Sequence, residues 1–201
     1  MPNIGAVILA AGESSRLGQP KQLIRFRGRS LVQRAVDAAA DADCWPIVIV
    51  IGGHNSDVAV DLPQTATLVV ENEDWRNGIG TSIRRGIRGL IEAAPELEAA
   101  VLLVCDQPFL HAALIKRLIL CWTESARPIV ASGYADTLGV PALFGRMFFK
   151  VLLALPDNCG AKGIIFRNRD QVAAIPFPEG KIDIDTTEDL ERLSTERERR
   201  D

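Results

Sequence analysis

Two cations in a loop of small residues, close to the start of the chain, are the residues whose types and spacing point most directly to chemistry. Arg16 and Lys21 keep their charge at neutral pH, and they follow the segment Leu9-Ala10-Ala11-Gly12. Such a loop lets phosphate oxygens approach backbone N–H groups closely. It is not a Walker A loop, because five residues separate Gly12 from Gly18. We expect it to bind a nucleoside triphosphate; the alternative is a glycine-containing turn with two solvated cations.

A carboxylate follows an apolar segment in the middle of the chain. Asp106 lies in the run Val104-Cys105-Asp106-Gln107-Pro108, directly after a predicted buried strand. An aspartate at that place can hold Mg²⁺ against a triphosphate, because Mg²⁺ takes few protein carboxylates and completes its shell with phosphate oxygens and water. The alternative is an aspartate that caps the following turn.

A second acidic cluster spans residues 182–190. If its two isoleucines pack inward in a short strand, Asp183 and Asp185 point together to the other face. Threonines of the same segment can instead cap a final helix that begins near Thr187, with the later acidic residues at its positive end.

A glycine-rich segment follows a third predicted strand. Gly78 and Gly80 allow a tight loop, and Thr81 or Ser82 opens a helix whose free N–H groups can face a nucleotide or a phosphorylated acceptor. Trp75 precedes the glycines, and packing in the core is an alternative role for it.

The elements that position these residues alternate between strand-like and helix-like segments. The predicted strands are 4–8, 47–51, 66–70, 99–104 and 129–131, with an extended segment 140–144 and strand candidates 172–175 and 182–184. The predicted helices are 30–43, 81–94, 110–125, 147–155 and 160–167, and one from residue 187. This alternation predicts an α/β fold: a doubly wound, mainly parallel sheet flanked by helices, with the site at the carboxyl ends of the strands.

The composition is that of a soluble globular protein, with 47% hydrophobic and 24% charged residues in 201. We expect a single domain over residues 1–194 and a charged, frayed end over 195–201. A net charge of −3 gives no basic field that would recruit nucleic acid. No apolar run approaches the roughly 20 residues of a membrane span, and no secretory signal is evident. The cysteines Cys44, Cys105, Cys121 and Cys159 lack metal spacing and fit a reducing cytoplasm.

The first loop resembles the nucleotidyltransferase signature L-A-A-G-x-x-x-R-[LM]-G-x-x-K, and motifs in matching order extend the resemblance from Leu9 to Leu190. They indicate the molybdopterin nucleotidyltransferases, with the molybdenum cofactor cytidylyltransferases the nearest branch. The guanylyltransferase branch usually has glycine where this chain has Ala11, and a methyl group there should crowd a purine more than a pyrimidine. The resemblance implies a Rossmann-like fold of the nucleotide-diphospho-sugar transferase type.

The resemblance also assigns roles to particular residues. It implies that Lys21, Arg16 and Asp106 are catalytic and that Asp106 and Asp185 hold Mg²⁺. It implies nucleotide contacts from Leu9, Ala10, Ala11, Gly12, Arg16, Lys21, Gly80 and Ser82. It implies acceptor contacts from Trp75, Gly78, Thr81, Ser82, Gly139, Pro141, Gly160 and Lys162. The chain departs from the family pattern at Asp157-Asn158, where the family usually has Gly-Asp.

The implied reaction is the Mg²⁺-dependent transfer of CMP from CTP, or another nucleoside triphosphate, to the terminal phosphate of molybdopterin, with release of pyrophosphate. A molybdenum hydroxylase or its chaperone is the implied protein partner. One alternative is a cytidylyltransferase for an isoprenoid or sugar phosphate, since Pro20-Lys21-Gln22 also occurs in the isoprenoid enzymes. The other is a non-catalytic cofactor-delivery protein, or an oxidoreductase like some relatives; the change at 157–158 leaves it open, while Arg16, Lys21 and Asp106 favour catalysis.

Overall fold

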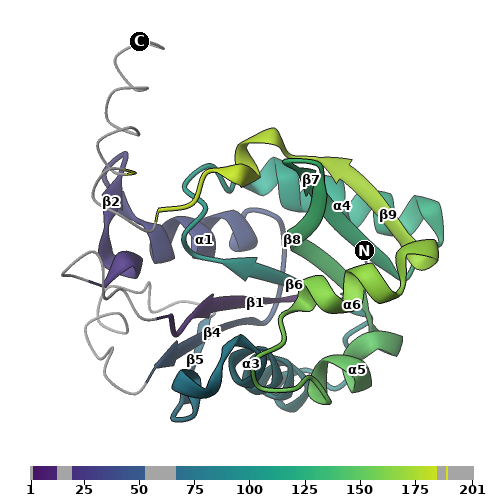
Figure 1. Ribbon diagram of the computed structural model, residues 1–201, viewed down its shortest axis with the longest axis horizontal. Helices are drawn as coiled ribbons and strands as arrows, with labels where there is room; N and C mark the ends of the chain where they lie inside the picture. Colours follow the sequence, from purple (N-terminus) through teal and green to yellow (C-terminus); the bar gives the residue numbers. More distant parts are fainter. Residues whose placement is uncertain (1, 13–19, 53–66, 185–188, 190–201) are drawn as a thin grey trace.

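The computed structural model describes residues 2–12, 20–52, 67–184 and 189. Within these ranges, seven strands form one sheet in the order β5-β4-β1-β6-β8-β7-β9 (Figure 1). Their bounds are β1 Ile4–Ala10, β4 Ile47–Gly52, β5 Thr67–Asn72, β6 Ala99–Val104, β7 Ile129–Tyr134, β8 Thr137–Gly145 and β9 Val172–Pro176. Strands β2 Arg25–Phe26 and β3 Arg29–Ser30 form a separate small hairpin.

Helices and short 3₁₀ turns connect these strands. The helices are α1 Leu31–Ala40, α3 Ile79–Ala93, α4 Ala112–Ser125, α5 Phe149–Leu153 and α6 Ala161–Arg167. The 3₁₀ turns are η1 Lys21–Leu23, η2 Trp75–Asn77, η3 Arg146–Phe148, η4 Arg169–Gln171 and η5 Pro178–Lys181. No helix in the described ranges is long and apolar enough to cross a bilayer.

Most neighbouring strands of the large sheet run parallel. Strand β1 pairs in parallel with β4 on one side and β6 on the other, and β5 and β9 pair in parallel with β4 and β7. Strand β8 is antiparallel to both β6 and β7. It returns from β7 through Ala135 and Asp136, whose φ angles of 48° and 56° are those of a tight hairpin turn. The predicted fold class, a doubly wound and mainly parallel sheet, is confirmed.

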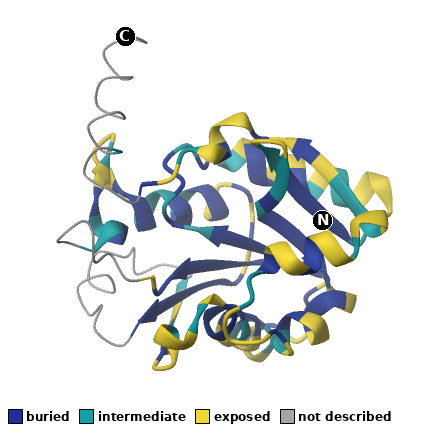
Figure 2. Cartoon of the chain, in the orientation of Figure 1, coloured by how far each residue is buried: buried dark blue, intermediate teal, exposed yellow. Residues whose placement is uncertain are grey.

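The two faces of the sheet carry separate apolar layers (Figure 2). Along β1, Ala6, Ile8 and Ala10 pack with side chains of α1 and α4, while Val7 and Leu9 pack with α3, α5 and α6. Because alternate residues of a strand face opposite sides, a strand covered on both faces is apolar throughout. All seven residues of β1 are accordingly buried.

Several element boundaries differ from the prediction. Helix α1 begins after Ser30 as expected, and a capping box of Ser30 and Gln33 fixes its start. The predicted helix 147–155 is divided into η3 and the short helix α5. The strand predicted at 129–131 continues to Tyr134, because the hairpin with β8 extends its pairing.

The prediction of a strand at 182–184 is wrong. The chain leaves η5 through a turn in which the Ile182 N–H donates to Glu179 O over 3.0 Å, and the Ile184 N–H then donates to Asp106 O over 3.1 Å. The isoleucines face inward as expected, since Ile184 is completely buried, but against the loop after β6 and not in a sheet. The structure does not describe residues 185–188 and 190–201. Asp185 and the predicted final helix, apart from residue 189, therefore lie outside the described residues.

Candidate active site

The carboxyl ends of β1 and β6 bring two predicted catalytic residues together. The strands pair as far as Leu9 and Val104, so the segments that follow them emerge side by side. Lys21 begins η1 beyond the first loop, and its Nζ lies 2.7 Å from Asp106 Oδ2. The Lys21 and Asp106 side chains are only 14% and 21% exposed. The prediction that these residues share a site therefore has a direct geometric basis.

Gly12, two residues beyond β1, lies beside the lysine side chain. A Cβ added to Gly12 would lie 3.8 Å from Lys21 Cε, so the side chain crosses the glycine on its way to Asp106. Leu9, Ala10 and Ala11 are buried and Gly12 is exposed, which leaves the glycine as the accessible part of this segment. Arg16 lies outside the described residues.

Ala11 does not occupy the place that the argument about base size assumed. Its side chain is 5% exposed and belongs to the apolar layer that includes Val7 and Leu9. The methyl group therefore faces the core, and any effect of Ala11 on the choice of base acts through the path of the backbone.

The loop after β6 is tied to two distant segments behind Asp106. Gln107 is 5% exposed, and its Nε2 donates to Gly180 O over 3.0 Å and to Val140 O over 3.3 Å. The bond from Ile184 N–H to Asp106 O adds a third connection. Sequence reasoning did not single out Gln107, although its position next to a predicted metal ligand was a signal.

Tyr134 stands next to this junction. Its hydroxyl donates to Val140 O over 3.0 Å, and a Cβ on Gly139 would lie 2.4 Å from that hydroxyl, so a side chain at position 139 would displace the tyrosine. Burial raises the pKa of the Tyr134 phenol, the charge of Asp183 raises it further, and a hydrogen bond from Gln107 opposes the rise. The tyrosine and the charge of Asp183 thus belong to the surroundings of the Asp106 loop.

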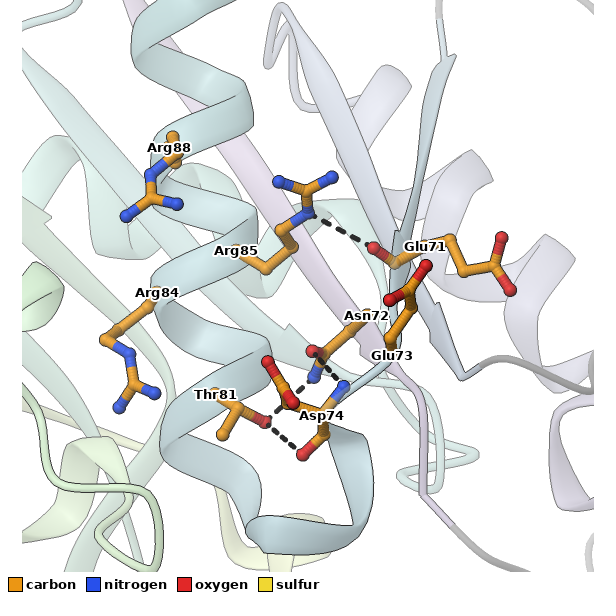
Figure 3. A pocket seen from close by; sticks show the side chains of 8 residues that line it. All are labelled: Glu71, Asn72, Glu73, Asp74, Thr81, Arg84, Arg85 and Arg88. Carbon is orange, nitrogen blue, oxygen red and sulfur yellow. Dashed lines mark hydrogen bonds between the residues drawn. The ribbon is translucent and has the colours of Figure 1, made fainter.

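The predicted helix start at Gly78–Ser82 forms a second group, and Asn72 at the end of β5 organises it. Asn72 Nδ2 donates to Thr81 Oγ1 over 2.8 Å (Figure 3). It also donates to Ser82 Oγ over 2.9 Å. Both hydroxyl-bearing residues are buried. The geometry gives Thr81 and Ser82 a part in holding α3 against β5.

The two glycines of this group let another loop approach closely. A Cβ on Gly80 would lie 2.1 Å from Pro156 O, and one on Gly78 would lie 2.4 Å from Asp157 O. The Gly80 N–H donates to Asp157 O over 2.8 Å. This N–H of the helix start therefore has a hydrogen-bond partner within the protein. Gly78 also has a φ of 133°, which favours glycine.

The departure from the family pattern at Asp157-Asn158 has a structural counterpart. The Asp157 carboxylate forms an ion pair of 2.5 Å with Arg84 of α3. Arg84 also donates to Leu155 O. The carboxylate is therefore engaged in fastening its loop to α3.

Trp75 connects this group to the first loop. A Cβ on Gly52, the last residue of β4, would lie 3.2 Å from the Trp75 ring and 3.2 Å from Ala11 O. The ring is partly buried, and the Arg76 guanidinium lies 4.8 Å from its centre. The Trp75 ring and Ala11 O thus both lie beside the position that a side chain at residue 52 would take.

The remaining predicted acceptor residues are spread along the edge of this region. Pro141 O accepts a hydrogen bond of 2.7 Å from Ser132 Oγ, and Gly160 precedes α6 as its N-cap. Lys162 is exposed, with its Nζ 5.9 Å from the centre of the Phe166 ring on the same helix. The structure does not bring Lys162 to the Lys21–Asp106 pair.

A cavity of about 550 Å³ lies between β5 and α3 (Figure 3). Its lining includes three arginines, Arg84, Arg85 and Arg88, and three acidic residues. The arginine side chains do not converge in Figure 3, and Arg85 Nε donates to Glu71 O over 3.1 Å. It shares Asn72 and Thr81 with the helix start, but neither Lys21 nor Asp106 lines it.

The residues at the strand ends fit a divalent metal bound together with a phosphate ligand. The Asp106 carboxylate supplies an oxygen donor of the kind that Mg²⁺ prefers, at a partly exposed position. The described residues contain no cluster of three possible metal ligands. An ion at Asp106 would therefore depend on ligand oxygens, or on residues outside the described ranges.

The doubly wound sheet, with a lysine loop and a carboxylate at the ends of adjacent strands, defines a nucleotidyltransferase. The chain belongs to the family of the MobA-like NTP transferase domain, whose profile matches residues 6–172. The predicted family and enzyme class are thereby confirmed.

Individual relatives agree with this membership. The chain is 34% identical over 149 residues to nicotine blue oxidoreductase of Paenarthrobacter nicotinovorans, covering 73% of this chain and 69% of that protein. It is 29% identical over 146 residues to the bifunctional enzyme IspD/IspF of Erythrobacter litoralis, covering 71% of this chain but only 36% of that enzyme. The crystal structure of Rv0371c from Mycobacterium tuberculosis has a TM-score of 0.79 at 30% identity and covers 96% of this chain and 97% of that one. A complex of Rv0371c with manganese has also been solved, with a TM-score of 0.75.

Proposed function

We propose that this protein transfers CMP from CTP to the terminal phosphate of a molybdopterin-type acceptor and releases pyrophosphate. The observation that carries the proposal is the 2.7 Å pair of Lys21 and Asp106 at the carboxyl ends of β1 and β6. It joins a cation suited to a triphosphate and a carboxylate suited to Mg²⁺ at one edge of the sheet.

In the proposed reaction, an oxygen of the acceptor phosphate attacks the α-phosphorus of the nucleotide in line with the leaving group. A new P–O bond forms as the bond to the β-phosphate oxygen breaks, and pyrophosphate leaves. The acceptor phosphate is already ionised, so the step needs alignment and charge neutralisation more than a strong base.

Different residues bind the triphosphate, the metal ion and the rest of the nucleotide. Lys21 leaves Asp106 and binds the triphosphate, where its charge stabilises the negative charge that builds up on the leaving group. Arg16 is proposed to bind the same phosphates. Asp106, and Asp185 by resemblance, would hold Mg²⁺, which would supply positive charge to offset the charge of the phosphates. Leu9, Ala10, Ala11 and Gly12 supply the backbone against which the nucleotide lies.

The acceptor is proposed to lie between the two groups of residues that flank the pair. Trp75 and the glycine-rich start of α3 lie on one side, and Gly139 and Pro141 of β8 lie on the other. The Trp75 ring and Ala11 O both lie near Gly52, and this proximity supports the arrangement. The similarity to the IspD/IspF enzyme supports a different phosphorylated acceptor as the second candidate.

The test incubates the protein with Mg²⁺, molybdopterin and CTP, GTP or ATP in separate reactions, and measures pyrophosphate. The proposal expects acceptor-dependent pyrophosphate release with CTP. Release only with an isoprenoid or sugar phosphate would replace the acceptor. Absence of release with every nucleotide and acceptor would contradict the transferase proposal for this chain.

A further inference from the structure

Gln22, the residue after the proposed catalytic lysine, is completely buried beside the first loop. Its Nε2 donates two hydrogen bonds, one of 2.7 Å to Ala10 O and one of 3.0 Å to Gly12 O. Its Oε1 is buried and has no hydrogen-bond partner in the described part of the chain. One amide therefore holds two carbonyl groups of the loop, while its own oxygen stays unpaired.

The end of a neighbouring strand explains why these carbonyls need a donor. Strand β1 pairs with β6 only as far as Leu9 and Val104, so Ala10 and Gly12 lie beyond the last pair on that side. The Ala11 carbonyl lies on the opposite side, near Gly52 of β4. Carbonyls alternate in direction along an extended chain, and Gln22 supplies on the β6 side the donors that the strand no longer provides.

The direction of these carbonyls matters at an anion site. A loop binds phosphate through N–H groups that point at the ligand, whereas a carbonyl oxygen turned toward the ligand repels it. Each peptide unit is planar, so fixing its C=O also fixes the N–H of the same unit. Two bonds from Gln22 keep two such units from rotating.

We propose that Gln22 is a positioning residue for nucleotide binding, which turns the Ala10 and Gly12 carbonyls into the protein and away from the triphosphate. This inference rests on the proposed function, because it assumes that the loop after β1 binds the nucleotide. The unpaired Oε1 supports it: an apolar side chain would avoid this unfavourable buried oxygen but would hold neither carbonyl.

Lys21 and Gln22, which are adjacent in η1, then have different roles. The Lys21 side chain extends over Gly12 to Asp106, where a bound triphosphate can draw it away. The Gln22 amide is instead bound to the Ala10 and Gly12 carbonyls. In this proposal Lys21 moves to the bound triphosphate, and Gln22 maintains the conformation of the loop backbone.

The experiment measures CTP binding in the presence of Mg²⁺ and without acceptor, by titration calorimetry. Gln22→Met keeps the length of the side chain and removes both donors. Asn168→Leu is the matched control, because Asn168 Nδ2 also donates to a backbone carbonyl, Ile164 O, over 2.8 Å, but at the end of α6. Thermal unfolding of both variants without nucleotide measures their stability.

We expect Gln22→Met to raise the Kd for CTP by about tenfold or more, which corresponds to about 1.4 kcal/mol, and Asn168→Leu to leave it within about threefold of the wild-type value. If Gln22→Met does not fold, Gln22→Asn replaces it; its amide is retained but is too short to reach both carbonyls, and the same direction is expected.

An unchanged Kd for the Gln22 variant, or equal weakening in both variants, would overturn the inference while the proposed function stands. Wild-type protein that binds none of CTP, GTP or ATP would remove the proposed function and the inference with it. A loss confined to the KM for the acceptor would also contradict a role in nucleotide binding.

Discussion

Lys21 Nζ and Asp106 Oδ2 lie 2.7 Å apart, although 85 positions separate the two residues in the chain. The ion pair gives each group a partner of opposite charge. Catalysis by the proposed mechanism requires it to open, because the lysine must reach the phosphates and the carboxylate must reach a metal ion. In the proposed mechanism, a nucleotide bound with a divalent metal ion takes the place of this pair.

Replacement of Lys21 tests the role of the cation. Lys21→Ala should lower kcat by about 100-fold or more, because a charge aimed at the developing negative charge of the transition state is lost. Steady-state kinetics with CTP measure the effect. Lys116→Ala is the control, since Lys116 is an exposed lysine 3.9 Å from Asp43, and it should keep full activity. A Lys21→Ala variant with near wild-type kcat would exclude the assigned role.

Replacement of Asp106 separates a metal ligand from a structural cap. Asp106→Asn should abolish Mg²⁺-dependent activity and change the Tm by only a few degrees, because a partly exposed ion pair contributes about 1 kcal/mol or less to stability. Activity across a Mg²⁺ titration and thermal unfolding are measured together. Asp37→Asn, which breaks the exposed pair of 3.1 Å with Arg29, serves as control and should keep its activity. A large fall in Tm together with a normal Mg²⁺ dependence would favour the capping role.

The glycine at the start of α3 gives a prediction for stability. Gly80→Ala should destabilise the fold by about 1–3 kcal/mol, because the new methyl group overlaps a backbone carbonyl that cannot move freely. Gly163→Ala is the matched control within α6, where an added Cβ meets its first neighbour, the end of the Arg167 side chain, at 3.8 Å. It should be neutral or stabilising by up to about 1 kcal/mol. Denaturant unfolding measures the free energy of unfolding of both variants. Equal values for Gly80→Ala and Gly163→Ala would show that the loop 156–159 accommodates the new methyl group without loss of stability.

The cysteines differ in their expected reactivity. Burial raises the pKa of the Cys44 thiol to about 12 and that of Cys105 to about 12, with the charges of Asp43 and Asp106 adding to the respective rises. Both thiols are therefore protonated and inaccessible at pH 8. Iodoacetamide at that pH should label only Cys121 and Cys159 in the native protein and all four after denaturation, as peptide mass spectrometry will show. Rapid native labelling of Cys105 would mean that the strand end beside Asp106 opens.

Much of the fold could be predicted from the sequence because its central strands are continuous apolar segments. Strands β1, β4 and β6 are buried on both faces, so their apolar runs are continuous and their ends are sharp. The positions of Lys21 and Asp106 follow from the order of these strands. The prediction failed at 182–184, because two alternating isoleucines also fit a segment that packs against a loop without pairing.

The parts of the site that the sequence did not reveal depend on contacts between distant segments. Gln22 and Gln107 look like ordinary polar residues until the carbonyls they bind are known. Gly78 and Gly80 were predicted to allow a tight loop before a helix that Thr81 or Ser82 opens, and the structure shows that residues 156–159 lie against both glycines. Local sequence patterns carry no information about such a loop, because its approach is set by the packing of α3 and α5.

The fate of the α-phosphate of CTP tests the central claim most directly. The protein is incubated with Mg²⁺, acceptor and CTP labelled at the α-phosphate or, in a parallel reaction, at the γ-phosphate. The account predicts that the α label appears on the acceptor and the γ label in pyrophosphate, in equal amounts, and that Lys21→Ala slows both by about 100-fold or more. Release of the γ label as single phosphate, or an acceptor that gains no α label, would contradict nucleotidyl transfer by this site.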